Sequence, residues 1–349
     1  MKNKFEIHAV ITTIQEPTAS VHVLVNRLSE VNGKLIVAGD SKGPQSYTAP
    51  IDRPWPVEFL SLSSQQSSIF KLAKNLPENH YARKNIAYLK AIACGALCIY
   101  ETDDDNAPMD QWQPRSEFLA RARVVPEHDS RWINVYRYFS SDTIWPRGLP
   151  LDEISKSIPD TQMAQEPRRA PIQQGLVNGS PDVDAIWRLV MDRSFSFDRG
   201  ESLYLEPGNW VPFNTQSTWW WPLVYPLLYI PSYCSFRMCD IWKSFVAQRC
   251  LWELGFGVAF HAPEVIQERN PHDLMNDFRS EIPGYEGNRE ICSILSDLVL
   301  ERDEEAVARN LRCCYNELIK KGFFPESENI LLDSWLSDLD AANNAYSRN

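Results

Sequence analysis

The sequence lacks the short motifs that mark several common enzyme classes. It contains no G-x-S-x-G, no P-loop and no G-x-G-x-x-G, which argues against a serine hydrolase, a P-loop nucleotidase and a dinucleotide-binding dehydrogenase. None of its eight cysteines forms a CxxC pair, and their neighbours are mostly apolar. We therefore interpret the cysteines as reduced residues of the core.

The sequence also has no excess of positive charge and no apolar run long enough to span a membrane. Its formal net charge is -11, and an acidic chain repels a phosphate backbone, so nucleic acid is not an expected partner. A small anionic ligand remains compatible with this charge, because a metal ion can reverse the field inside one cleft. We expect a cytoplasmic protein without a membrane span.

What the sequence does contain is an alternation of strand and helix signals. Apolar, β-branched runs predict strands at 5–14, 34–38, 57–62 and 97–100, and helical spacing predicts helices at 20–31 and 82–95. This alternation indicates an α/β fold with a mainly parallel sheet, in which ligands bind at the carboxyl ends of the strands. The last part of the chain is charged and helical without a strand signal. We therefore predict a main domain, 1–287, and a small helical C-terminal region, 288–349.

The strongest local signal is a run of carboxylates directly after a predicted strand. The apolar segment 97–100 leads into Glu101, Thr102 and then Asp103, Asp104 and Asp105. Adjacent unpaired carboxylates repel one another, and a divalent cation removes that repulsion. Hard oxygen ligands suit Mg²⁺ or Mn²⁺, and a metal held there can bridge a diphosphate. The alternative is a solvated acidic turn.

A second signal is the pair Arg83 and Lys84 at the start of the predicted helix 82–95. Two cations at a helix N-terminus oppose the helix dipole, which is unfavourable unless they face a phosphate. The alternative is an ordinary solvated basic turn.

Three further segments contribute polar side chains that could line a cleft. Asp182 and Asp184 follow the turn Asn178-Gly179, where Ser180 or Asp182 could equally cap the next helix. Asn214 and Gln216 lie between aromatic blocks, as expected of a sugar cleft, although the tryptophans at 219–221 could equally pack in the core.

Asp240 begins a predicted amphipathic helix on which Trp242 faces inward. A carboxylate there could be a helix cap or, at a cleft edge, a general base. Histidine offers little, although His261 and His272 occur late enough in the chain to reach a cleft.

Taken together, these segments resemble the STELLO glycosyltransferase-like family and, more distantly, the reversibly glycosylated polypeptides, which are UDP-arabinopyranose mutases. The resemblance covers roughly residues 5–280. It rests on the order and spacing of Thr12-Thr13, Gly39-Asp40, Arg83-Lys84-Asn85, the run Asp103–Asp105, the segment 178–184, Phe213-Asn214 and Asp240-Ile241-Trp242.

This resemblance implies a GT-A fold that binds a UDP- or GDP-sugar and transfers the sugar to a glycan or another hydroxyl acceptor, with Mn²⁺ or Mg²⁺ as cofactor. The run Asp103–Asp105 would be the DXD-type motif. Thr12, Thr13 and Asp40 would lie near the base and ribose, and Arg83 and Lys84 near the diphosphate. The sugar and acceptor side would contain Asp182, Asp184, Asn214, Gln216, Asp240 and Trp242.

Within this scheme, Asp240 is the first candidate for the catalytic base and Asp184 the second. The family pattern leads us to expect a late metal-binding histidine where this chain has Ile266-Gln267. The metal would therefore be held by Asp103 and Asp105, either with phosphate and water alone or with His261 or His272 from a shifted loop. Two other functions fit the same residues, namely a UDP-sugar mutase and a catalytically inactive nucleotide-sugar-binding or scaffold protein.

Overall fold

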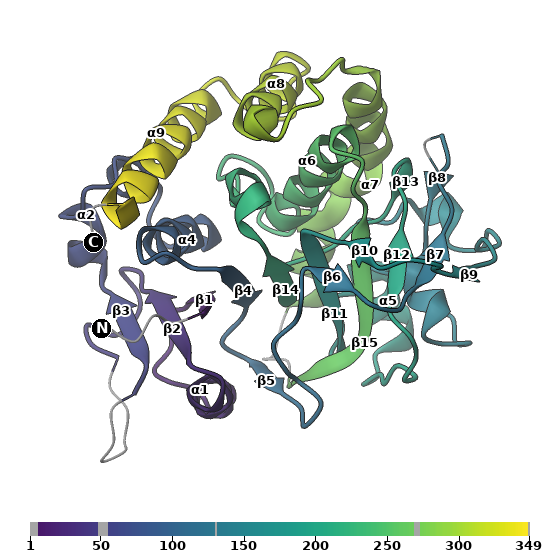
Figure 1. Cartoon of the computed structure of the whole chain (residues 1–349), viewed down its shortest axis with the longest axis horizontal. Helices are drawn as coiled ribbons and strands as arrows, with labels where there is room; N and C mark the ends of the chain where they lie inside the picture. The colour runs from purple at the N-terminus through teal and green to yellow at the C-terminus, as the bar shows by residue number, and fades with distance from the viewer. Residues whose placement is uncertain (1–5, 48–54, 130, 269–272, 348–349) are drawn as a thin grey trace.

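The computed structural model describes residues 6–47, 55–129, 131–268 and 273–347, and one sheet of 11 strands crosses them (Figure 1). The strand order is β3 (Val57–Leu60), β2 (Gly33–Ala38), β1 (Ile7–Thr12), β4 (Cys98–Thr102), β14 (Ser217–Trp220), β11 (Ile172–Gly179), β15 (Val258–Gln267), β12 (Leu203–Leu205), β7 (Arg123–Val125) and β9 (Gln162–Met163), with β5 (Asn106–Pro108) beside β15. Two small sheets pair β6 (Phe118–Leu119) with β10 (Arg168–Arg169) and β8 (Arg131–Trp132) with β13 (Asn209–Trp210).

The first four strands of this order are parallel, as the alternation of strands and helices predicts. β14 then runs antiparallel to both β4 and β11, while β11 and β15 are parallel to each other. The predicted α/β class with a large mixed sheet is therefore confirmed. β14 joins the N-terminal strands to those of the second half, so the two halves share one continuous sheet.

Helices cover both faces of the parallel strands. α1 (Ala19–Glu30) packs on one face, and its N-terminus is capped by the Thr18 hydroxyl, which accepts a hydrogen bond from the Val21 amide. α4 (Lys84–Ala93) packs with the other face. Alternate residues of β1 fall into the two cores accordingly, because successive side chains of a strand point to opposite faces.

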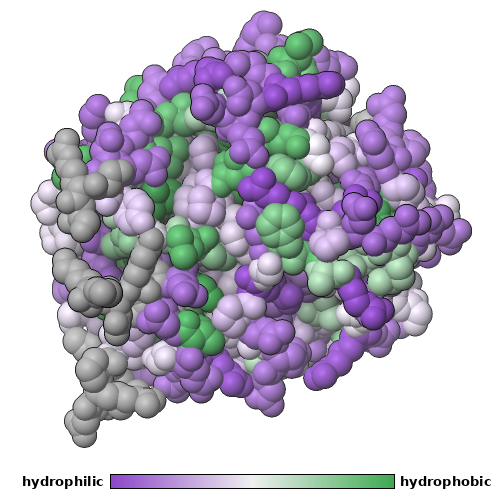
Figure 2. All heavy atoms as spheres, viewed as in Figure 1, coloured by the Kyte–Doolittle hydropathy of each residue, from purple (hydrophilic) through white to green (hydrophobic). Residues whose placement is uncertain are grey.

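The other helices follow the same numbering. They are α2 (Leu62–Gln66), α3 (Leu72–Asn75), α5 (Ala185–Met191), α6 (Cys239–Glu253), α7 (Leu274–Asp297), α8 (Val307–Lys320) and α9 (Glu328–Ser347), with 3₁₀ turns η1 (Tyr81–Arg83), η2 (Val135–Tyr138), η3 (Leu151–Glu153), η4 (Pro222–Leu228) and η5 (Glu304–Ala306). Within the described ranges, none of these helices combines the length and apolar character that crossing a membrane requires. On the face shown in Figure 2, polar and apolar side chains alternate over short distances.

The C-terminal part is helical, as predicted, but the predicted boundary after residue 287 falls inside α7. Asn288 accepts a hydrogen bond from the Trp242 indole nitrogen at 2.9 Å and donates one to the Gly148 carbonyl at 2.8 Å. Further on, α9 packs along α4, as Figure 1 shows, and Asp338 accepts the backbone N–H groups of Lys71 and Leu72 at 3.0 and 2.7 Å. The C-terminal helices therefore share a core with the sheet.

This shared core makes a prediction about stability. Trp335 of α9 is fully buried, and its indole N–H donates to the Pro226 carbonyl at 2.9 Å. Trp335→Ala should therefore lower the free energy of unfolding by about 3–5 kcal/mol, through the cavity and the lost packing. Ile330→Ala, at a position of the same helix that is 59% exposed, should change it by less than about 0.5 kcal/mol.

Urea unfolding followed by circular dichroism and by tryptophan fluorescence would measure both variants. We expect a single transition that moves as a whole in Trp335→Ala. A separate early transition of the C-terminal helices would contradict the shared core.

Candidate functional site

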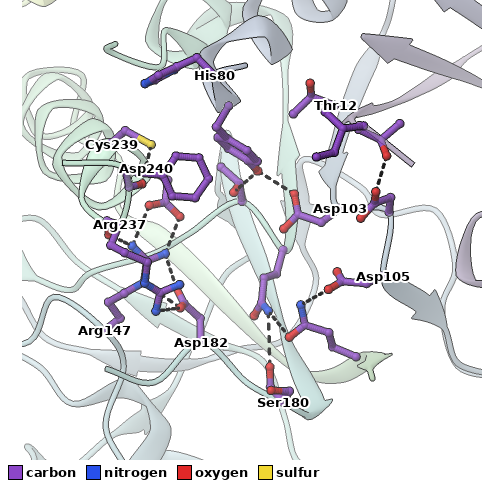
Figure 3. Close-up of a pocket in the computed structure, with 18 of the residues that line it drawn as sticks. Thr12, His80, Asp103, Asp105, Arg147, Ser180, Asp182, Arg237, Cys239 and Asp240 are labelled. Carbon is purple, nitrogen blue, oxygen red and sulfur yellow. Dashed lines mark hydrogen bonds and ion pairs between the residues drawn. The ribbon is translucent and has the colours of Figure 1, made fainter. Parts of the chain in front are cut away.

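A cavity of about 480 Å³ opens where β1, β2 and β4 reach their carboxyl ends (Figure 3). The segment after β11, the start of β14 and the start of α6 form the opposite wall. The residues that line it include Thr12, Thr13, Asp40, Lys42, His80, Tyr81, Asp103, Asp104, Asp105, Arg147, Ser180, Asp182, Arg188, Thr215, Gln216, Phe236, Arg237, Asp240 and Gln267. The position agrees with the rule that ligands of such sheets bind at carboxyl strand ends.

The second wall depends on Gly179, the last residue of β11, which has φ +80°. An L side chain rarely adopts this backbone conformation, and a Cβ there would also meet the backbone oxygen of Gln267. Glycine therefore lets the chain leave β11 at an angle that brings Ser180 and Asp182 to the cavity.

The three consecutive carboxylates after β4 turn to different partners. Asp103 accepts hydrogen bonds from the Tyr81 hydroxyl at 2.6 Å and from the Lys84 ammonium at 3.0 Å. Asp104 accepts from the Thr13 hydroxyl. Asp105 accepts from the Gln267 amide at 2.9 Å through Oδ2, whereas its buried Oδ1 has no hydrogen-bond partner within the described residues.

Asp105 is the carboxylate whose ionisation the fold disfavours most clearly in this run. Burial is the main reason that its pKa rises to about 6. The nearby negative charges of Asp103 and Asp104 also raise this pKa, whereas the hydrogen bond from Gln267 lowers it. Burial also raises the pKa of Asp104. A cation beside these oxygens would remove the cost of keeping them ionised.

These observations test whether a divalent cation fits the site. Carboxylate oxygens are the ligands that Mg²⁺ and Mn²⁺ prefer, and the unpartnered Oδ1 of Asp105 can accept such an ion. Among the described residues, however, no group of three His, Cys, Asp or Glu side chains is arranged to hold a metal. A cation would therefore need further ligands from a bound molecule or from water, as Mg²⁺ usually does.

Across the cavity, Arg147 is clamped between two carboxylates (Figure 3). Its Nε and one terminal nitrogen donate to the two oxygens of Asp182, both at 2.8 Å. Its terminal nitrogens also donate to the two oxygens of Asp240 at 2.9 and 2.8 Å. Arg147 was not predicted as a site residue from the sequence.

This clamp fixes the charges of its members. Burial opposes the charge of Arg147, but Asp182 and Asp240 outweigh it and raise the pKa of the guanidinium well above its usual value. Burial likewise opposes ionisation of Asp182, but the charge and hydrogen bonds of Arg147 prevail and lower its pKa. Asp182 therefore faces the cavity as an anion at neutral pH, and Asp240 accepts two hydrogen bonds from the same guanidinium.

Six predicted site residues lie outside the cavity lining, and four of them have structural roles that argue against their predicted ones. Arg83 is buried and donates to the carbonyls of Pro77, Ala73 and Leu76, so it orders the chain before α4 and does not face a phosphate. Asp184 caps α5 through the Trp187 amide at 2.8 Å and accepts from the Trp145 indole at 2.7 Å. It is completely buried and is not placed to act as a base.

His261 and Trp242 are the other two corrections. The ring nitrogens of His261 contact the Ser202 hydroxyl at 2.7 Å and the Gln173 amide oxygen at 2.9 Å, and burial holds its pKa well below the usual value, so it is a core residue and not a metal ligand. Trp242 is buried against α7 and does not reach the cavity. His272 lies outside the described residues.

The remaining two residues, Lys84 and Asn214, do not line the cavity but contact residues that do. Lys84 is buried beneath the cavity wall and forms an ion pair with Asp103, so it holds the acidic run from below. The side-chain oxygen of Asn214 accepts from the Gln216 amide N–H at 2.9 Å and from the Gln174 side chain, which fixes the lining segment before β14. The other predicted residues all line the cavity, namely Thr12, Thr13, Asp40, Asp103, Asp104, Asp105, Asp182, Gln216 and Asp240.

The comparisons with known proteins agree with the resemblance seen in the sequence. Residues 237–348 match the family of STELLO glycosyltransferases. The chain is 29% identical over 275 residues to "Probable glycosyltransferase STELLO2" and 28% identical over 273 residues to "Probable glycosyltransferase STELLO1", both of Arabidopsis thaliana. The predicted resemblance to the STELLO family is confirmed.

Each of these two matches covers 73% of this chain, but only 35% and 34% of the STELLO relatives, so the chain spans about a third of their length. Among solved structures, the crystal structure of a mycobacterial protein aligns with 79% of this chain and 70% of its own at a TM-score of 0.38 and 9% identity. A likeness of that degree supports no statement about fold or function. The match at residues 237–348 includes Asp240 at the cavity and extends through the C-terminal helices.

Proposed function

We propose that this protein is a glycosyltransferase with a GT-A-type donor site, which binds a UDP- or GDP-sugar with the help of Mn²⁺ or Mg²⁺ and transfers the sugar to a hydroxyl group of an acceptor. The observation that carries the proposal is the arrangement around one cavity. The carboxylates of Asp103, Asp104 and Asp105 end a parallel strand on one side, and the anionic pair Asp182 and Asp240 lies on the other. The similarity to STELLO glycosyltransferases agrees with this reading.

The proposed base and ribose side is the wall made by Thr12, Thr13 and Asp40. Asp40 accepts backbone N–H groups from Ser41 at 2.7 Å and from His80 at 3.0 Å, so it shapes this wall as well as lining it. Lys42 is exposed beside it and supplies a positive charge that suits a phosphate.

The proposed diphosphate side is the acidic run. A divalent cation there would neutralise the charge that develops on the departing nucleoside diphosphate. Asp103 and Asp105 are the residues that would hold it, and the diphosphate would complete the coordination that the described side chains do not supply. Tyr81 links this side to the opposite wall, because its hydroxyl contacts both Asp103 and the Thr215 hydroxyl at 2.6 Å.

Asp240 is the proposed contact for the attacking hydroxyl. Its side chain lies at the cavity, in the first turn of α6, where the N-terminal end of the helix favours the anion. Arg147 fixes the direction of this carboxylate through two hydrogen bonds. A hydroxyl that donates a hydrogen bond to Asp240 would be held in place and could pass its proton there as the new glycosidic bond forms.

A thermal-shift panel of UDP, GDP and their sugars, each with Mn²⁺ and with EDTA, tests the proposal. A ligand at 100 times its dissociation constant raises the free energy of unfolding by about 2.7 kcal/mol, so the melting temperature should rise with one nucleotide in Mn²⁺ only. Incubation of the best donor with and without candidate acceptors then separates the functions. Release of the nucleoside diphosphate that depends on an acceptor supports transfer, whereas isomerisation of the donor without an acceptor would indicate a mutase.

Failure of every nucleotide and nucleotide-sugar to shift the melting temperature would overturn the proposed donor site.

A further inference from the structure

One part of the cavity offers hydrogen-bond acceptors that the protein leaves unused. A chain of side-chain bonds settles which atoms these are. The Asp105 carboxylate accepts from Gln267, so Gln267 must turn its amide nitrogen to Asp105 and its oxygen to Gln216. Gln216 then donates to that oxygen at 2.9 Å, and its own Oε1 is left without a partner within the described residues.

Gln216 is only 8% exposed and lines the cavity, so this orphaned oxygen is costly unless a ligand donates to it. The unpartnered Oδ1 of Asp105 belongs to the same chain of side chains, because Gln267 contacts both Asp105 and Gln216. Because Asp105 Oδ1 is the oxygen that the proposed cation would take, Gln216 Oε1 is the buried acceptor left for a ligand that donates a hydrogen bond.

The facing wall has the same character. A guanidinium has five N–H groups, and the five hydrogen bonds of Arg147 go to the oxygens of Asp182 and Asp240 and to the Arg237 carbonyl. The two Asp182 oxygens and Asp240 Oδ2 each keep a lone pair for a ligand, whereas Asp240 Oδ1 also accepts the Ile241 backbone N–H at 3.0 Å. Arg147 itself thus turns its donors away from any ligand.

The other two arginines of the lining are also engaged. Arg237 donates to the buried Glu281 at 2.8 and 3.0 Å, and Arg188 donates to the Ser180 hydroxyl at 2.8 Å. The space between Gln216, Asp105, Asp182 and Asp240 is therefore dominated by oxygens that accept. Hydroxyl groups suit such a surface, whereas carboxylate, sulfate or phosphate groups would be repelled by the two anionic aspartates.

We propose that this space is a subsite for a neutral, polyhydroxylated sugar ring, and that Arg147 is the positioning residue that holds Asp182 and Asp240 as paired anionic acceptors for its hydroxyls. The inference deepens the proposed transfer function and rests on it only for the source of the ring. The ring could belong to the nucleotide-sugar donor or to the acceptor, and the experiment separates these two sources.

For the donor source, calorimetry in Mn²⁺ would compare UDP, UDP-glucose, UDP-galactose and UDP-glucuronate. We expect one neutral sugar to add affinity over UDP, and the uronate to add none. For the acceptor source, saturation-transfer NMR would follow a neutral oligosaccharide and a sulfated one, with and without UDP. We expect the neutral compound alone to show contacts.

Three variants locate the ring. Gln216→Met removes the orphaned oxygen at similar size, and the loss of one hydrogen bond should weaken sugar binding by about 2–10-fold while UDP binding stays unchanged. Gln162→Met, an exposed change on β9, is the matched control and should alter neither. Arg147→Lys keeps a charge but loses the two-sided fork, so the sugar contribution should fall by about 10-fold or more.

Arg147→Lys has a second readout that a merely structural role would not move. Asp182 is faced by Arg147, Arg237 and Arg188, and of these Arg147 contributes most to its low pKa. With the fork removed, burial should raise this pKa, so sugar binding should weaken as the pH falls from 7 to 5, whereas binding to the unchanged protein should stay level.

Two results would overturn the inference. Neutral and anionic sugars that bind equally, in both the donor and the acceptor arm, would show that the subsite does not read hydroxyls. Loss of Mn²⁺ affinity in Gln216→Met without any nucleotide would show that the orphaned oxygen serves a cation instead. If no nucleotide binds, the proposed donor site fails, and NMR with the free oligosaccharides still decides the subsite.

Discussion

Asp105→Asn is expected to weaken Mn²⁺-dependent nucleotide binding by at least about 100-fold. Partners of a metal's ligands are commonly worth 10–100-fold in metal affinity, and a direct ligand should be worth no less. The change removes one negative charge and one of the two oxygens that could hold the ion, while the amide can still accept from Gln267. Calorimetry of UDP and GDP in Mn²⁺ and in EDTA measures the effect.

The same variant makes a second prediction of opposite sign. The pKa of Asp105 is raised from its ordinary value of 3.8 to about 6, so its ionisation lowers the stability of the fold as the pH rises between these two values, and the full loss is present above about 6. Without metal at pH 7, Asp105→Asn should therefore melt at a higher temperature than the unchanged protein, and the difference should shrink as the pH falls below 6.

Asp110→Asn is the matched control, because Asp110 is a fully exposed carboxylate that follows the acidic run and pairs with Arg27 on the surface. It should leave nucleotide binding unchanged. Equal affinity of the unchanged protein for nucleotide in EDTA and in Mn²⁺ would contradict the metal requirement itself.

Asp240→Asn is expected to lower the rate of sugar transfer by about 10²–10⁴-fold, because an amide cannot take a proton from the attacking hydroxyl. The affinity for UDP should not change, since Asp240 lies across the cavity from the acidic run (Figure 3). Stability should fall as well, because Arg147 loses one of two buried carboxylates. Initial rates at saturating donor, with the melting temperature, measure both effects.

Asp182→Asn separates the chemistry from the ion pair. This change also removes one of the two buried carboxylates that pair with Arg147. It should therefore lower the stability about as much as Asp240→Asn does. Its effect on activity should appear mainly in KM, through weaker sugar binding, and much less in kcat. If both variants lower kcat equally, Asp240 acts through Arg147 and does not contact the reacting hydroxyl.

The features that could be predicted from the sequence are local ones. The acidic run follows its strand directly, so its place at a sheet edge needs only the strand signal before it. The helical C-terminus and the strands of the N-terminal half follow from periodicity in the same way. Asp240 falls in the first turn of α6, as its position before an apolar helical face indicates.

Arg147 could not be predicted in this way. It lies in a stretch rich in proline, glycine and aromatic residues without a clear period, and its partners are 35 and 93 residues further along the chain. A local sequence pattern covers too few residues to connect these three side chains. The local sequence shows only a charged residue between Pro146 and Gly148 in an otherwise apolar segment, which does not identify its partners.

The wrong assignments have a common cause: the order of residues along the chain does not show in which direction each side chain points. Arg83 and Lys84 are neighbours, yet one orders the backbone before α4 and the other supports Asp103. His261 and Gln267 share β15, but six residues of strand span about 20 Å, so only Gln267 reaches the acidic run.

The buried ion pair of Lys84 with Asp103 bears on the order in which the protein matures. A cluster of three carboxylates without any counter-charge would resist folding until a metal arrived, but here the polypeptide brings its own ammonium group to the cluster. Folding would therefore not require the divalent ion of the proposed function, which could bind afterwards. Under the proposed function, such a site could release its ion with each departing product and take up another from solution. Activity would then depend on the metal present during turnover and not on the metal present during folding.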